Sequence, residues 1–254
     1  MRDGELSEDE AIERLSTSSL WVWTAIEPES KLMVGLQVGD RGLAMAQAIL
    51  HQITQLLAPG CVPLFLSDGN PNYLPAIVAH FGHWVQPPRR HNRGPWPKPR
   101  WMPLPGLLYA QVVKRMRRRR IVEVIHRVMI GTQAKVDAVL APCGWQINTA
   151  IVERLNLSLR QRVAAIRRRS ATSCKSETGL TQPLILFQVY HNFVLAHASL
   201  RLPLAEPMAT NGSGSAKLWQ PRTPAMAAGL TDHVWTLREV LMFRVPPWPQ
   251  PQMS

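Results

Sequence analysis

The sequence has few cysteines and no long apolar run. Its three cysteines lie far apart and are odd in number, which argues against a disulfide framework and for a reducing compartment. No apolar run approaches the length of a membrane span, and the N-terminus has no secretory signal. Neither H-x-H nor paired C-x-x-C spacing occurs, so a zinc site is not expected.

Acidic residues are scarce in the middle of the chain. Residues 86–175 hold 20 of the 29 Lys and Arg residues but only three acids, a net charge of +17. Residues 1–30, in contrast, hold eight of the 17 acids. Concentrated arginine indicates a polyanionic partner, because a guanidinium binds phosphate bidentately. A membrane surface is the competing explanation, and it is disfavoured because the basic run 114–120 adjoins a strand pattern rather than an amphipathic helix.

The 254 residues are 46% hydrophobic, which is typical of a globular protein with one sizeable core or two small ones. Apolar spacing predicts a hairpin from strands 20–26 and 31–38, a helix over 43–57, a strand over 62–66, and a helix over 73–81. Further on, it predicts strands 107–113 and 121–130, helices 133–140 and 184–195, and a small C-terminal piece, 225–245. This order describes an α/β domain with a mixed sheet.

Other segments are expected to be irregular or separate. Residues 86–106 are rich in Pro, Arg and Trp, and we expect no regular element there because proline lacks the amide donor. Residues 211–215 (NGSGS) read as a flexible linker. We therefore divide the chain into an acidic N-terminal helix or loop (1–19), a main domain (20–202), and a linker with a small C-terminal segment (203–254).

Residues 147–160 (INTAIVERLNLSLR) predict a helix with one acid among basic and amide side chains. At 100° per residue, one face carries an apolar stripe of Val152, Leu155, Leu159, Val163 and Ile166. Glu153, Asn156 and Arg160 line an adjacent polar flank. Such a flank suits a metal held beside a phosphate backbone, although a surface helix with a chance glutamate has the same pattern.

Asp68 ends a predicted buried strand and precedes Gly69, so it is expected at the C-terminal edge of a sheet, where ligands bind in open α/β folds. An Asp-Gly pair is also a common turn signal. Together with Glu153, it forms a pair of carboxylates from separate elements, and such a pair can share Mg²⁺ ions that act on a phosphodiester.

In order and spacing, these motifs resemble small insertion-sequence transposases of the DDE class. The resemblance covers roughly residues 20–200 and rests on 65–69 (FLSDG) with Tyr73, on 147–160, on 167–169 (RRR), and on 173–176 (SCKS). The segment 223–235 (TPAMAAGLTDHVW) also looks like transposase tails. The resemblance implies a ribonuclease H-like fold and Mg²⁺- or Mn²⁺-dependent cleavage and transfer of DNA at element ends.

Carried over by position, Asp68 is the second acid of the catalytic triad and Glu153 is the third, and both are expected to bind the metal. The residues expected to contact DNA are Arg117, Arg118, Arg119, Arg120, Arg154, Asn156, Arg160 and Lys175. Trp84, Trp96 and Trp101 are candidates for stacking on unpaired bases, and ordinary packing is the alternative that we favour.

The chain departs from the family pattern at the first acid. The family places its first catalytic Asp on a strand ahead of the hairpin, whereas here the predicted hairpin 20–38 comes first. We expect that strand and its Asp to lie upstream of Met1 and to be absent, with Glu27 as the alternative first acid. Two carboxylates in place of three predict activity lower by orders of magnitude.

The resemblance implies DNA as partner, no membrane, a homo-oligomer, and a cytoplasmic, nucleoid-associated location. The leading hypothesis is a DDE transposase impaired in strand transfer. The alternatives are a non-catalytic DNA-binding remnant and a ribonuclease H-like nuclease that acts on RNA–DNA hybrids.

Overall fold

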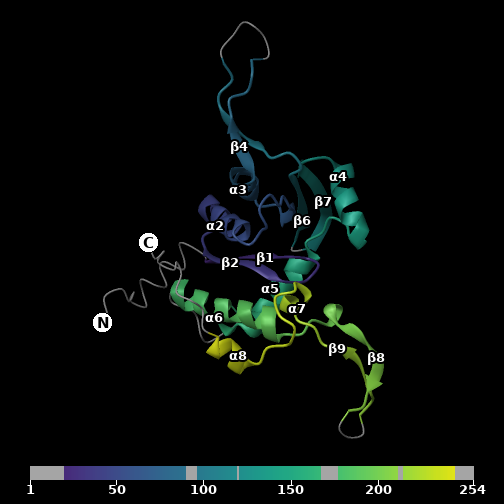
Figure 1. Ribbon diagram of the computed structural model, residues 1–254. Helices are drawn as coiled ribbons and strands as arrows, with labels where there is room; N and C mark the ends of the chain where they lie inside the picture. Colours follow the sequence, from purple (N-terminus) through teal and green to yellow (C-terminus); the bar gives the residue numbers. More distant parts are fainter. Residues whose placement is uncertain (1–19, 90–95, 119, 167–176, 211–213, 244–254) are drawn as a thin grey trace, which may run out of the picture.

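The computed structural model describes residues 20–89, 96–118, 120–166, 177–210 and 214–243 (Figure 1). Within them, helices alternate with small sheets, which confirms the α/β class. The strands form one three-stranded sheet and three two-stranded sheets. In these residues, no helix has the length and apolar character needed to cross a membrane.

The predicted N-terminal hairpin is confirmed as β1 (Trp21–Ile26) and β2 (Met33–Gly39), which pair antiparallel. The second strand begins two residues later than predicted, because Lys31 has a φ of 62° and belongs to the turn. The hairpin lies between α2 (Leu43–Thr54) on one side and two later helices on the other (Figure 1). Its two faces therefore belong to two different hydrophobic clusters.

Helix α5 (Ala150–Arg162) packs its predicted apolar stripe against the hairpin. Leu155, Leu159 and Val163 are buried in the hydrophobic cluster that lies between the hairpin, α5 and a later helix, and Val152 and Ile166 are half-buried. The polar flank is consequently held in a fixed orientation by the core. The amphipathic reading of this segment is confirmed.

Helix α6 (Glu177–Val189) begins earlier than predicted and continues as a π-helical turn over Tyr190–Val194. The prediction began after Pro183 because proline usually ends a helix. Here Leu180, Leu184 and Phe187, spaced for one helix face, are all buried against β2. This packing holds the segments on both sides of the proline in one helix.

The three-stranded sheet is mixed, as predicted. Strand β3 (Leu64–Asp68) is parallel to β6 (Leu108–Arg117), which is antiparallel to β7 (Arg120–Ile130). One face packs on α2 and α3 (Tyr73–His80) through Phe65 and Tyr109. The other packs on α4 (Gln133–Leu140), which has the predicted bounds.

The prediction that residues 86–106 contain no regular element was wrong at their end. Arg100–Pro103 form β5, which pairs antiparallel with β4 (Gly82–Val85). Pro103 is tolerated because it is the last residue of its strand. Trp84 and Trp101 pair across this hairpin with ring centroids 5.8 Å apart.

The segment after residue 203 was predicted to begin with a linker, but it contains regular elements. Strands β8 (Leu202–Met208) and β9 (Lys217–Gln220) form an antiparallel hairpin, whose connection includes the loop-forming residues 211–215. Beyond it lie α7 (Pro224–Ala227) and α8 (Leu237–Met242). Short 3-10 helices span Ala141–Cys143, Ala164–Ile166 and Ala198–Leu200. The acidic helix predicted within residues 1–19 lies outside the described residues.

Candidate functional site

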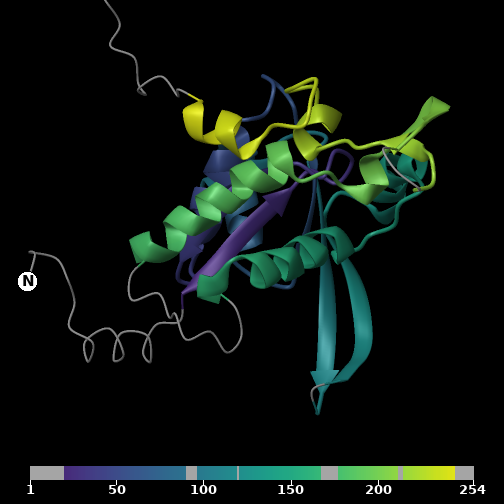
Figure 2. The ribbon, with the colours of Figure 1, turned by 90° about the horizontal axis from the view of Figure 1, so that it is seen from below.

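The distal part of the β6–β7 hairpin projects from the body of the molecule (Figure 2). We call residues 114–124 the basic ribbon. In β6, burial ends at Val112, and every residue from Lys114 to Arg117 is exposed. In β7, every residue from Arg120 to Val124 is exposed. Both faces of the ribbon are therefore open to a partner.

The charge of the basic ribbon is almost entirely positive. It contains six Lys and Arg residues and a single acid, Glu123. That acid lies opposite Arg115 in the strand register, and its carboxylate is 2.9 Å from the guanidinium. The arginines at the tip have no acid in the ribbon to neutralise them. This arrangement produces a strong positive potential on a narrow projection.

The turn of the ribbon has an unusual composition. Arg117 pairs with Arg120, so the connection consists of two further arginines. Arg118 has a φ of 49°, in the left-handed region where tight hairpin turns usually place glycine or asparagine. An arginine there costs about 1 kcal/mol or more in backbone strain. Local stability thus does not explain these arginines.

Apolar side chains accompany the arginines on the ribbon. Met116, Ile121 and Val122 are 63%, 53% and 61% exposed. An isolated two-stranded ribbon with uncovered apolar residues is unfavourable in water unless a partner covers it. The major groove of B-DNA admits a two-stranded β-ribbon and offers phosphates along its rims and apolar thymine methyl groups on its floor.

Glu153 lies in the first turn of α5, next to the base of the ribbon. Its carboxylate forms an ion pair with the ammonium of Lys114 and accepts a 2.6 Å hydrogen bond from the Thr149 hydroxyl. Partial burial favours the neutral carboxyl, but the hydrogen bonds from Lys114 and Thr149 outweigh burial and lower the pKa of Glu153. Glu153 is therefore ionised at neutral pH and already has a cationic partner.

Asp68 ends β3, as predicted, and its carboxylate is exposed. One carboxylate oxygen accepts a 3.1 Å hydrogen bond from the backbone N–H of Asn70. Burial raises the pKa of Tyr73, and the charge of Asp68 raises it further. Burial also raises the pKa of Tyr109, whose hydroxyl lies 2.8 Å from the Ser67 hydroxyl. The strand end is thus surrounded by neutral hydroxyl groups.

Asp68 and Glu153 lie on the same side of the three-stranded sheet. Asp68 pairs in register with Val112, and Lys114, two residues further along β6, contacts Glu153. Both carboxylates line one cavity of about 1660 Å³. In the described part of the chain, however, no group of three or more His, Cys, Asp or Glu side chains could hold a metal ion. A cation that bound the Glu153 carboxylate would have to displace Lys114.

The alternative first acid, Glu27, has a local role. Its carboxylate accepts hydrogen bonds from the backbone N–H groups of Glu29 at 2.8 Å and Ser30 at 2.6 Å, and it also contacts the Ser30 hydroxyl. These bonds stabilise the β1–β2 turn. They account for an acid at this position without any role in catalysis.

The other predicted DNA contacts fall into separate groups. Arg117, Arg118 and Arg120 are at the ribbon tip. Arg154 and Arg160 are exposed on α5, whereas Asn156 accepts a 2.9 Å hydrogen bond from the Thr24 hydroxyl, a structural contact to β1. Arg119 and Lys175, and the motifs 167–169 and 173–176, lie outside the described residues.

Two residues that contact Glu153 were not predicted as site residues. Lys114 was counted only as the start of the basic run, and Thr149 only as part of the helix motif. The pairing of Lys114 with Glu153 joins residues 39 positions apart, and no spacing rule indicates it. A threonine four residues before a glutamate on a helix is a usable signal, since such positions share a face.

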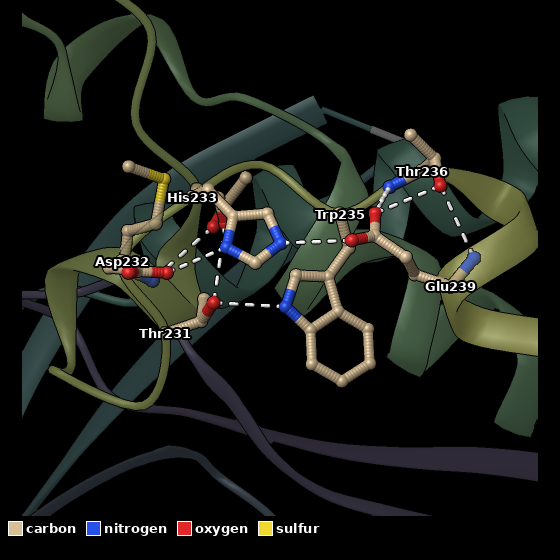
Figure 3. A network of polar contacts seen from close by, with 8 residues as sticks. Thr231, Asp232, His233, Trp235, Thr236 and Glu239 are labelled. Carbon is tan, nitrogen blue, oxygen red and sulfur yellow. Dashed lines mark hydrogen bonds and ion pairs between the residues drawn. The ribbon is translucent and has the colours of Figure 1, made fainter.

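A polar network organises the C-terminal segment (Figure 3). The His233 ring lies 2.6 Å from an Asp232 carboxylate oxygen and 3.1 Å from one of Glu239. Glu239 and Thr236 form a capping box at the start of α8. The indole N–H of Trp235 donates a 2.9 Å hydrogen bond to the Thr231 hydroxyl. The Trp235 ring also packs on Phe193, with the two ring centroids 4.6 Å apart. The network joins α8 to the π-helical turn.

We expect this network to depend on pH. Hydrogen bonds to Asp232 and then Glu239 raise the pKa of His233 above its usual 6.5. The stability that the protonated His233 ring contributes is therefore complete below about pH 6.5, and it is lost as the pH rises through the raised pKa of the folded state. An NMR titration of the ring should give the raised pKa, and Asp232→Asn should shift it back towards 6.5. A wild-type value at or below 6.5 would contradict the network.

Comparisons with protein-family models, curated proteins and solved structures found no match to this chain.

Proposed function

We propose that this chain is a DNA-binding protein of the DDE transposase type, and that the basic ribbon makes its main contact with duplex DNA. The exposed, arginine-tipped ribbon is the observation that carries the proposal. Its shape fits the major groove, its cations match phosphates on the groove rims, and its exposed apolar residues need a partner.

Helix α5 adds a second basic surface to this proposal. Arg154 and Arg160 are exposed on the helix that carries Glu153, and Glu153 contacts the base of the ribbon through Lys114. Cations on both elements would follow one DNA backbone as it leaves the groove. Arg154 and Arg160 are thus proposed as positioning contacts, with little dependence on base sequence.

A salt titration tests DNA binding. Fluorescence anisotropy with a labelled duplex should give a linear fall of log K with log salt. If about six cations bind phosphate, affinity should fall on the order of 1000-fold between about 50 and 200 mM salt. An affinity that does not change over this range would contradict phosphate contacts.

The second candidate function is DNA strand cleavage and transfer, and the shared cavity of Asp68 and Glu153 favours it. We propose a ribonuclease H-like arrangement, in which hairpin, helix, acid-terminated strand and acid-bearing helix surround that cavity. Because the described residues include no group of three side chains suited to a metal ion, and Lys114 pairs with Glu153, we assign no metal-dependent step to this site. Binding without efficient strand transfer is the function that the geometry supports best.

A further inference from the structure

The cavity next to Asp68 runs along the free edges of two strands. All six residues of β1 and all five of β3 line it. Successive side chains of a strand point to opposite faces, so a cavity over one face would contact alternate residues only. Residues of both faces of β1 and β3 line the cavity, so it extends around these strands and reaches the edge that each leaves unpaired.

These two edges have no strand partner in the described part of the chain. Strand β1 pairs with β2 on its other side, and β3 pairs with β6 on its other side. A free edge presents unpaired backbone N–H and C=O groups, which are favourable partners for another strand. Two such edges facing one cavity provide hydrogen-bonding groups for both sides of a single inserted strand.

The walls of the cavity specify the side chains of that strand. Ile53 of α2, together with Leu56 and Leu57 just after it, forms an apolar wall. The opposite wall, from α5, carries Glu153, Asn156 and Arg160. An inserted strand is therefore expected to be apolar at alternate positions facing α2 and polar at positions facing α5. Charge complementarity favours a basic residue near Asp68 and an acidic one near Arg160.

We propose that an extended segment of a partner polypeptide inserts between β1 and β3 and joins the two sheets into one. This mode of recognition combines main-chain hydrogen bonds for affinity with alternating side chains for specificity. It is independent of the basic ribbon.

A synthetic peptide tests the insertion. The probe is an acetylated, amidated strand of about seven residues, Lys-Val-Thr-Val-Thr-Val-Glu, which spans about 23 Å when extended. The control has the same side chains but N-methyl groups on alternate amides, which remove the hydrogen bonds to one edge. Isothermal titration with the full chain should show binding of the probe that is about tenfold or more tighter than that of the control. Equal affinity, or no binding of either peptide, would overturn the proposal.

Hydrogen exchange identifies the occupant. The proposal predicts fast exchange of edge amides in β1 and β3 of the free monomer and slow exchange with the peptide bound. Protection already present in the free monomer would show that the chain fills its own cavity, and protection only in a dimer would identify a second copy. Either result would contradict a partner strand. Alanine variants of the ribbon arginines should bind the peptide as the wild type does, so failure of DNA binding and failure of strand insertion are distinguishable.

Discussion

Replacing Arg117, Arg118, Arg119 and Arg120 with alanine is expected to weaken binding to duplex DNA by roughly a hundredfold or more at about 0.1 M salt. Each phosphate contact that is lost also reduces the slope of log K against log salt by about 0.9. The fold should tolerate these replacements, since Arg117 and Arg120 are exposed and alanine keeps the Cβ that arginine already places at the positive φ of residue 118.

The matched control removes four positive charges elsewhere. Lys98, Arg100, Arg201 and Lys217 are exposed on the β4–β5 and β8–β9 hairpins, away from the ribbon (Figure 1). Their replacement with alanine lowers the net charge equally, so it measures the non-specific effect of charge. The proposal predicts a slope close to that of the wild type for this control. Equal losses in both variants would show that net charge, rather than the ribbon, determines binding.

The second prediction concerns catalysis. In a joining assay with pre-cleaved ends and Mg²⁺ or Mn²⁺, we expect the wild-type chain to produce no more joined product than the double variant Asp68→Asn, Glu153→Gln. The reason is that the described part of the chain holds no group of three side chains suited to a metal ion, and that Glu153 already forms an ion pair with Lys114. Loss of a catalytic ligand lowers rates by orders of magnitude.

The two proteins must bind the ends equally for this comparison to be valid, and the anisotropy assay provides that check. Joining by the wild type that clearly exceeds joining by the double variant would show a working metal site. That result would make strand transfer, rather than DNA binding alone, the function of the chain.

Local patterns were sufficient to predict the elements whose apolar residues face one core. The helix over Gln133–Leu140 was predicted with its observed bounds, and the stripe through Leu155 and Leu159 identified the buried face of α5. In both, side-chain periodicity and packing agree. The position of Asp68 at a strand end was also predicted, because a short apolar run precedes it, although the residues of that strand are half-buried rather than buried.

The sequence was less informative where tertiary contacts override local preference. Pro183 suggested a helix start, yet burial of Leu180 and Leu184 extends α6 across it. Strand β5 ends in a proline and was predicted as irregular. Its antiparallel pairing with β4 nevertheless holds these residues in a strand. Propensity describes one segment at a time, whereas pairing depends on a second segment.

The candidate site shows the same limit. The basic run was evident from composition, but its position on a projecting ribbon depends on where β6 leaves the core after Val112. The partner of Glu153 comes from another element, so its ion pair with Lys114 could not be predicted from spacing along the chain. The open edges of β1 and β3 follow only from the sheet topology.

Site-specific photocrosslinking locates the DNA on the protein. A photoreactive benzoylphenylalanine replaces Ile121 on the ribbon in one protein and Leu56, equally accessible at the end of α2, in another. We predict a salt-sensitive crosslink to duplex DNA from position 121 and none from position 56. Crosslinking from position 56 alone, or equally from both, would contradict DNA binding by the ribbon.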